Sequence, residues 1–381
     1  MVYHLLFPLS WKIPALSWFR VFQYTSFRIV GAALTAILLG FVLSPWFIRR
    51  LQARQIGQVV RKDGPATHHV KAGTPTMGGS FIVFSVVTST LLWGVLTNVY
   101  VWLALAVTVA YAAIGFLDDY LKLSRRNPQG LRASYKFGAQ IVVAAAVVGA
   151  LFLHYKFDPH LALPFVAPSR FMPYLGAYLY VAFGVIVVVG TSNAVNLTDG
   201  ADGLAAVPVA LNAFVYLILS YIAGTVLAFK VGGTWIDVNI AEYLRVPYIQ
   251  GAGELAVLCA AVVGSCLVFL WYNTYPAQVF MGDVGALSLG GALGMVALLT
   301  KNEFLSVILG GIFVVEAVSV ILQVGYFQLW GKKRGGKKIL LMSPLHHHFE
   351  LKGWSEPQVV VRFWIIQVFL ALVALATLKL R

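Results

Sequence analysis

Long apolar runs divide the chain into blocks of about 20 residues, the length at which a helix spans a bilayer core of about 30 Å. No other feature limits the possible folds as much. We count ten blocks, at residues 28–48, 78–97, 99–117, 137–154, 173–191, 203–227, 255–272, 284–300, 304–329 and 361–379. The sequence therefore predicts an all-α membrane protein with about ten transmembrane helices.

The composition agrees with a membrane protein. Only 11% of the 381 residues are charged and 60% are hydrophobic, whereas a soluble domain carries about 25% charged residues. We find no long linker and no internal repeat, so we expect residues 1–381 to form a single membrane domain. The first 27 residues mix Trp11 and Trp18 with Lys12 and Arg20 and lack the apolar core of a signal peptide. We expect this segment to lie at the membrane interface.

Basic residues collect in the loops on one side of the predicted bundle. Six follow the first helix, five follow the third, six follow the ninth and Arg362 begins the last, which gives 18 of the 28 Lys and Arg residues. The positive-inside rule makes this side cytoplasmic. Because the helix count is even, we expect both termini on the periplasmic side.

Polar segments with many glycines recur at the predicted cytoplasmic helix ends. The first runs from Lys71 to Gly79 and leads into the second helix. Its glycines leave backbone N–H groups open to an anion at a helix N-terminus. Thr76 suits an N-cap, so a capped helix start beside a solvated lysine is the alternative.

Two adjacent carboxylates, Asp118 and Asp119, close the third helix. They stand at the negative end of the helix dipole and repel each other, so they require a cation. Mg²⁺ or the basic residues Lys122, Arg125 and Arg126 can supply it, and a carboxylate beside Mg²⁺ and phosphate suits a general base. A solvated acidic pair is the alternative.

Further polar residues follow the fifth helix and precede the eighth. Asn196, Asp199 and Asp202 recur every three residues, so their oxygens converge if this turn is helical. Alternatively, Thr198 or Asp199 simply caps the next helix. Asp283 suits an N-cap of the eighth helix, while Phe280 before it suits stacking on a nucleobase.

Three consecutive histidines, His346, His347 and His348, follow a basic run. On an irregular loop they cannot all reach one metal ion, so a zinc site is not expected. They can donate hydrogen bonds to a diphosphate or simply face solvent. Glu316 lies inside an apolar run and must face protein or a water-filled cleft, as part of a buried pair or of the catalytic site.

Together these segments resemble the phospho-N-acetylmuramoyl-pentapeptide transferase family, within the polyprenyl-phosphate N-acetylhexosamine-1-phosphate transferase superfamily and glycosyltransferase family 4. The resemblance rests on Asp118–Asp119, Asn196–Gly200, Phe280–Asp283 and Pro344–His348, in that order, and spans nearly the whole chain. The Gly73–Gly79 segment and the histidine motif favour the muramoyl branch. Ala201 departs from the pattern, since members commonly have leucine there.

This resemblance implies a bacterial inner-membrane enzyme with its cleft on the cytoplasmic face. It would transfer phospho-N-acetylmuramoyl-pentapeptide from UDP to undecaprenyl phosphate with Mg²⁺, giving lipid I and UMP. It would act as a homodimer, with membrane lipid and no nucleic acid among its partners. The implied catalytic residues are Asp118, Asp119, Asp283, His346, His347 and His348, with Asp283 binding Mg²⁺. The implied substrate-binding residues are Lys71, Thr76, Lys122, Asn196, Asp199, Gly200, Asp202, Asn273 and Phe280.

Two other functions fit parts of the sequence. A sister enzyme that transfers N-acetylglucosamine-1-phosphate to the same lipid would use the same aspartates. A transporter would explain ten helices and Glu316, but it should line a path at mid-membrane with charged groups. Here the carboxylates and histidines gather at one face.

Overall fold

The computed structural model describes residues 1–53, 73–125, 130–155, 157–231, 234–331, 336 and 338–380. In this part of the chain, nine helices are long and apolar enough to cross a membrane. They are α2 (Thr25–Ala53), α4 (Val99–Ser124), α5 (Ala133–Tyr155), α6 (Ala177–Thr198), α7 (Ala206–Gly224), α9 (Leu255–Asn273), α10 (Gly282–Leu299), α12 (Gly311–Tyr326, continued by the π-helical turn η4, Phe327–Gly331) and α14 (Glu356–Ala376). The predicted all-α membrane fold is confirmed.

The second predicted block, residues 78–97, is a shorter apolar helix, α3 (Gly79–Trp93), of 15 residues. The remaining elements lie at the ends of the bundle. They are α1 (Val2–Lys12), η1 (Pro14–Gln23), the antiparallel strands β1 (Val226–Val231) and β2 (Thr234–Asn239), α8 (Ile240–Tyr243), η3 (Ala252–Glu254), α11 (Leu305–Leu309) and α13 (Leu345–Leu351).

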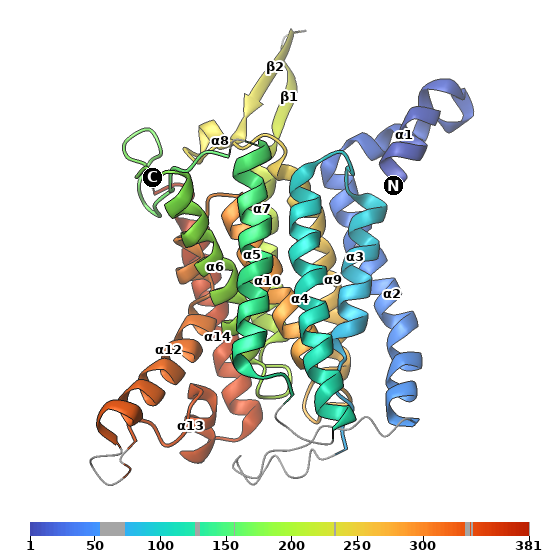
Figure 1. Cartoon of the computed structure of the whole chain (residues 1–381). Helices are drawn as coiled ribbons and strands as arrows, with labels where there is room; N and C mark the ends of the chain where they lie inside the picture. Colours follow the sequence, from blue (N-terminus) through green and yellow to red (C-terminus); the bar gives the residue numbers. More distant parts are fainter. Residues whose placement is uncertain are drawn as a thin grey trace.

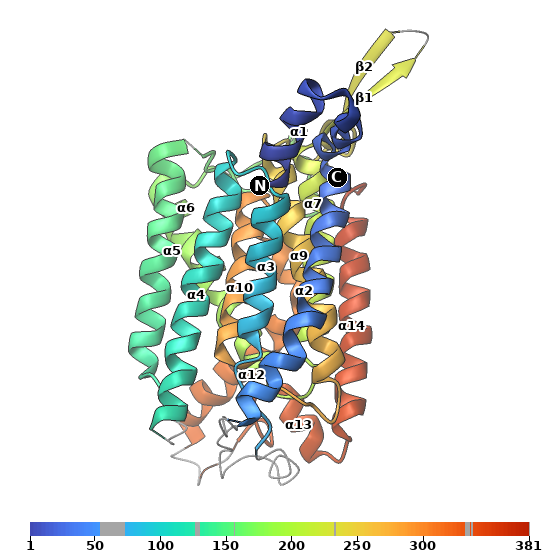
Figure 2. The ribbon, with the colours of Figure 1, turned by 90° about the vertical axis from the view of Figure 1, so that its right-hand side faces the viewer.

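The long helices run side by side and leave two distinct ends (Figures 1 and 2). One end carries α1, the β1–β2 hairpin and the last turn of α14. The opposite end carries α13, the end of α4 and the start of α10. The chain therefore begins and ends at the same end of the bundle, away from α13.

Helix α10 forms the centre of the bundle. It packs against α4 on one side and α6 on another, and every residue from Val284 to Leu299 is buried. Small residues permit this contact: a Cβ on Gly290 would lie 2.7 Å from the Cα of Ser192 on α6. A polar residue in the first turn of α10 is therefore placed in the middle of the protein rather than at its lipid surface.

The predicted ninth block, residues 304–329, is not one continuous helix. It breaks at Gly310 (φ −87°, ψ 21°) into α11 and α12, and α12 leans away from the bundle (Figure 1). The Gln367 amide on α14 donates to the Leu309 carbonyl beside the break, at 2.7 Å. This side chain provides a partner for a backbone group that the interrupted helix leaves free.

Candidate active site

Three carboxylates from two helices meet at the end of the bundle that carries α13. Asp118 and Asp119 lie near the end of α4 and are almost fully buried, and Asp283 lies in the first turn of α10. One oxygen from each lies within 4.8 Å of the others. The backbones approach closely at Gly115, where a Cβ would be only 2.3 Å from the Asp283 carbonyl oxygen. Asp283 is not the N-cap of α10, because Met281 occupies that position.

Two lysines neutralise much of this negative charge. Lys122 Nζ lies 2.5 Å from Asp118 Oδ2 and 2.6 Å from Asp283 Oδ2. Lys136 Nζ lies 2.8 Å from the same Asp283 oxygen and 3.7 Å from Asp118 Oδ2. The cation that the sequence required beside Asp118 and Asp119 is thus supplied in part by Lys122, whereas Arg126 lies outside the described residues.

Backbone groups from other elements fix the two α4 carboxylates. The Leu131 N–H donates to Asp118 Oδ1 at 2.7 Å, and the Val284 N–H donates to Asp119 Oδ2 at 3.3 Å. Asp118 is thereby tied to the start of α5, and Asp119 to the start of α10. Each carboxylate keeps a second oxygen, and both second oxygens face the lysines.

The end of α6 contributes an amide, and its C-cap contributes a further carboxylate. Asn196 Nδ2 donates to Asp283 Oδ1 at 2.5 Å. Helix α6 ends at Thr198, so Asn196, Asp199 and Asp202 do not share one helical face. Burial raises the pKa of Asp199 well above its usual range, and the charges of Asp283 and Asp119 raise it further. The Asn196 amide therefore links the end of α6 to the carboxylate cluster.

Asp202 and Asn273 hold the neighbouring loops in place. Asp202 Oδ2 accepts the Ala277 N–H at 3.0 Å, in the loop before α10. The buried Asn273 accepts the Gly203 N–H at 2.9 Å and donates to the Val279 carbonyl at 2.8 Å. Both side chains link the loop after α6 to the loop before α10.

The loop before α3 is joined to the loop before α10 by backbone hydrogen bonds. They run from Gly78 N–H to Phe280 O, from Gly79 N–H to Met281 O and from Phe280 N–H to Pro75 O, each at 2.8 Å. These bonds satisfy the start of α3, so the prediction that Thr76 caps this helix is wrong: Gly78 is the N-cap. Thr76 Oγ1 instead lies beside Gly282, 3.0 Å from where a Cβ on that glycine would be, and Asp119 Oδ2 lies 2.5 Å from the same point.

The three histidines lie on the short helix α13 rather than on the expected irregular loop. His346 is fully buried, 3.2 Å from Glu316 through Nδ1. His347 Nδ1 lies 3.1 Å from Glu350 Oε2, and His348 Nδ1 accepts the Leu341 N–H at 3.1 Å. The three rings therefore have three different partners.

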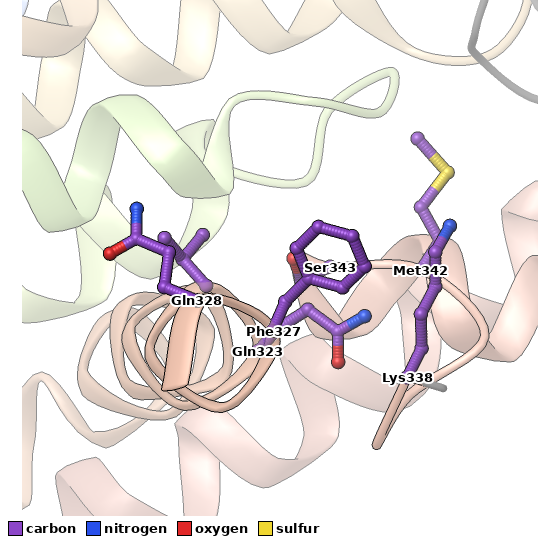
Figure 3. Close-up of a pocket in the computed structure, with 7 residues that line it drawn as sticks. Gln323, Phe327, Gln328, Lys338, Met342 and Ser343 are labelled. Atoms are coloured by element: carbon purple, nitrogen blue, oxygen red, sulfur yellow. The ribbon is translucent and has the colours of Figure 1, made fainter. Parts of the chain in front are cut away.

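A cavity of about 560 Å³ opens where α12 meets the chain that enters α13 (Figure 3). Gln323, Phe327 and Gln328 line it from α12 and η4. Lys338 and Met342 line it from the opposite segment. No carboxylate of the cluster lines this cavity, so the cavity is separate from the cluster.

Comparison with known proteins connects this geometry to a family. Residues 101–301 match the model of glycosyl transferase family 4, a stretch that contains all three clustered aspartates. The phospho-N-acetylmuramoyl-pentapeptide-transferase of Sorangium cellulosum (strain So ce56) is 53% identical to the chain over 389 residues, covering 100% of both. Proteins of the same name from Anaeromyxobacter sp. (strain K) and Geobacter sp. (strain M21) are also 53% identical over 100% of each chain. The chain belongs to the phospho-N-acetylmuramoyl-pentapeptide transferase family.

The clustered carboxylates fit a divalent metal ion. Asp118, Asp119 and Asp283 offer hard oxygen ligands of the kind that divalent cations prefer. Lys122 and Lys136 both approach one oxygen of Asp283, so the cluster already attracts positive charge to a single point. The acidic cluster can therefore hold a metal ion.

Lys136 lies in this site, 2.8 Å from Asp283 Oδ2, but was not predicted from the sequence as a site residue. It is the fourth residue of α5, where the positive end of the helix dipole disfavours a cation. The same argument that singled out Asp118 and Asp119 could have found it. Lys71 lies outside the described residues. Ala201, the departure from the family pattern, is buried in a hydrophobic cluster that also contains Leu204 and Phe363.

Proposed function

We propose that the chain transfers phospho-N-acetylmuramoyl-pentapeptide from its UDP carrier to undecaprenyl phosphate. The products are lipid I and UMP, in the first membrane step of peptidoglycan synthesis. The observation that carries the proposal is the cluster of Asp118, Asp119 and Asp283 with two lysines at one end of a membrane bundle. The polyprenyl chain of the acceptor stays in lipid, so its phosphate must react at such an end.

The proposal places the protein in the bacterial inner membrane, with the carboxylate cluster on the cytoplasmic side. The basic loops follow the first, third and ninth predicted helices and support this orientation. Both chain ends then lie on the periplasmic side, in a single domain of residues 1–381. Residues 1–27 lie at the outer interface, where Trp11 and Trp18 are 65% and 64% exposed. The homodimer that the family resemblance implies belongs to the same proposal.

Charge neutralisation is the main catalytic task of the site. The reaction brings a phosphate oxygen towards a diphosphate, so negative charges must approach each other. Lys122 and Lys136 lie where they can pair with those oxygens, because both already reach Asp283. When bound at Asp283, Mg²⁺ would withdraw charge from the diphosphate. Asp118 accepts the proton of the lipid phosphate, and Asp119 holds the start of α10 in place.

The UDP part of the donor binds beside this cluster. Phe280 presents a partly exposed ring in the loop before α10, and we assign it to the uracil, which offers a flat face for stacking. Thr76, Asn196, Asp199 and Gly200 surround the diphosphate. Asp202 and Asn273 support this pocket through the loops that they join. His347 and His348, on α13, close the cleft around the diphosphate and sugar.

A two-donor assay tests the proposal. The purified chain receives undecaprenyl phosphate, Mg²⁺ and either UDP-N-acetylmuramoyl-pentapeptide or UDP-N-acetylglucosamine, and released UMP is measured. We expect UMP only with the muramoyl donor. Release with N-acetylglucosamine alone would establish the sister reaction instead. Release with neither donor would reject both transferase assignments.

A further inference from the structure

Glu316 is a fully buried carboxylate to which the proposed reaction assigns no part. It lies on α12, within an apolar stretch where an unpaired charge is unfavourable. Its Oε2 accepts the Leu345 N–H at 2.7 Å, and its Oε1 accepts the His346 N–H at 3.1 Å. These N–H groups begin α13 and have no partner within that helix. Glu316 therefore fastens the start of the histidine helix to α12.

The His346 ring fills the space between Glu316 and the active-site loop. Its Nδ1 is 3.2 Å from Glu316 Oε1. On its other side, a Cβ on Gly200 would lie only 2.3 Å from Nε2. Neither ring nitrogen of His346 has a hydrogen-bond partner among the described residues, so packing rather than hydrogen bonding fixes the ring against the bare Cα of Gly200.

Gly200 connects this contact to the carboxylate cluster. It directly follows Asp199 and lies four residues after Asn196, whose Nδ2 donates to Asp283 Oδ1 at 2.5 Å. A displacement of the His346 ring would therefore move Gly200 and Asp199 relative to the cluster. The chain of contacts runs from α12 through α13 to the loop after α6.

A second side chain on the same face of α12 supports this arrangement. Gln323 follows Glu316 by seven residues, or two helical turns. Its Oε1 accepts the N–H groups of Ile339 and Leu340 at 3.2 and 3.0 Å, and its Nε2 donates to the Leu340 carbonyl at 3.3 Å. Because α12 leans away from the bundle (Figure 1), these side-chain contacts hold α13 and its entering chain to α12.

We infer that Glu316 is a positioning residue that sets the active-site loop through His346. It fixes the start of α13, and the His346 ring transmits that position to Gly200 and Asp199. His347 and His348 are carried on the same helix. The expected changes in kcat rest on the proposed function, whereas the contacts of Glu316 with α13 do not depend on any substrate.

The first test replaces one carboxylate oxygen. In Glu316→Gln, the amide oxygen can accept one N–H, but the amide nitrogen faces the other, so one of two bonds is lost. We expect kcat for UMP release to fall by about 10²-fold, the usual cost of misplacing a group by about 1 Å. KM for the UDP donor should change far less, and Glu316→Asp, which retains both acceptors, should recover part of kcat.

Glu303→Gln is the matched control. Glu303 is a carboxylate with 1% exposure that lies beyond the far end of α10, away from α13. It should retain the kcat of the unsubstituted chain. Equal losses of kcat in the two variants, or a change confined to KM in Glu316→Gln, would overturn the positioning role.

A double-mutant cycle tests the route through His346. A methyl group in Gly200→Ala collides with the ring from the opposite side, so this variant should also lower kcat. If both substitutions act by displacing the same ring, the double variant Glu316→Gln/Gly200→Ala should lose less than the product of the two single losses. Independent, multiplicative losses would contradict transmission through His346.

Hydrogen exchange provides a readout that needs no turnover. In Glu316→Gln, the Leu345 and His346 amides should exchange faster, while in Glu303→Gln they should remain as protected as in the unsubstituted chain. Unchanged protection in Glu316→Gln would reject the inference. If the unsubstituted chain released no UMP, the proposed function would fail, and exchange at these two amides would still decide whether Glu316 holds α13.

Discussion

Replacing Gly115 by alanine should separate the two helices that bear the carboxylates. The added Cβ would lie 2.3 Å from the carbonyl oxygen of Asp283 and 2.6 Å from the backbone nitrogen of Val284. Backbone atoms of a buried helix cannot swing aside as a flexible side chain can. Ordinary contact begins at 3.4 Å, so α4 and α10 must part by about 1.1 Å, the difference between 3.4 and 2.3 Å.

This displacement is large on the scale of the site. If Lys122 moves with α4, its 2.6 Å contact with Asp283 lengthens to about 3.7 Å, which is beyond hydrogen-bond distance. We therefore expect kcat to fall by about 10²-fold. Overpacking at this point should also lower the free energy of unfolding by about 1–3 kcal/mol.

The assay is the initial rate of UMP release at saturating substrates, with thermal unfolding in detergent as the check on folding. Gly149→Ala on α5 is the control, because nothing lies within 4 Å of its added Cβ and alanine favours a helix. It should keep full activity. If Gly115→Ala were as active as Gly149→Ala, the spacing of α4 and α10 would not control catalysis.

Three further predictions address separate parts of the structure. Asp283→Asn should abolish UMP release because the amide lacks the charge that two lysines approach; an active variant would exclude Asp283 as the metal ligand. Phe280→Ala should weaken binding of the UDP donor, measured by calorimetry, by about 1–3 kcal/mol; unchanged affinity would remove Phe280 from the uracil contact. Burial raises the pKa of Glu303 from its usual 4.5 to about 7, so the folded chain keeps a proton that the unfolded chain has released. The free energy of unfolding should therefore fall as pH rises from 4.5 through 7, by about 3 kcal/mol at about 1.4 kcal/mol per pKa unit. If the melting temperature of Glu303→Gln fell with pH as steeply as that of the unsubstituted chain, this prediction would be wrong.

Much of the architecture follows from local sequence. Apolar blocks of sufficient length predict spanning helices whatever their packing, and the structure contains them. Asp118 and Asp119 stood out because adjacent carboxylates at a helix C-terminus are locally unfavourable, and the structure supplies their cations from Lys122 and Lys136. Charged residues that are unfavourable at their position in a helix are informative, because only contacts with other parts of the fold can compensate for them.

Features that depend on distant partners were not predictable. Thr76 did not cap α3, because the loop before α10 supplies carbonyl oxygens to Gly78 and Gly79. The interruption at Gly310 lies in a continuous apolar run, so hydropathy could not reveal it. The partners of Glu316 lie about 30 residues further along the chain, in α13. The seven residues of this helix carry no sequence signal that predicted a helix there. In each case a contact between distant parts of the chain, rather than the local sequence, determines the structure.

The fate of the donor's β-phosphate tests the proposed chemistry most directly. UDP-N-acetylmuramoyl-pentapeptide labelled with ³²P at that phosphate would be mixed with undecaprenyl phosphate, Mg²⁺ and the purified chain. Because the phosphate travels with the sugar, we expect the label in an organic-extractable lipid and unlabelled UMP in water. Labelled UDP or labelled inorganic phosphate in the aqueous phase, with no labelled lipid, would contradict phospho-sugar transfer at this site.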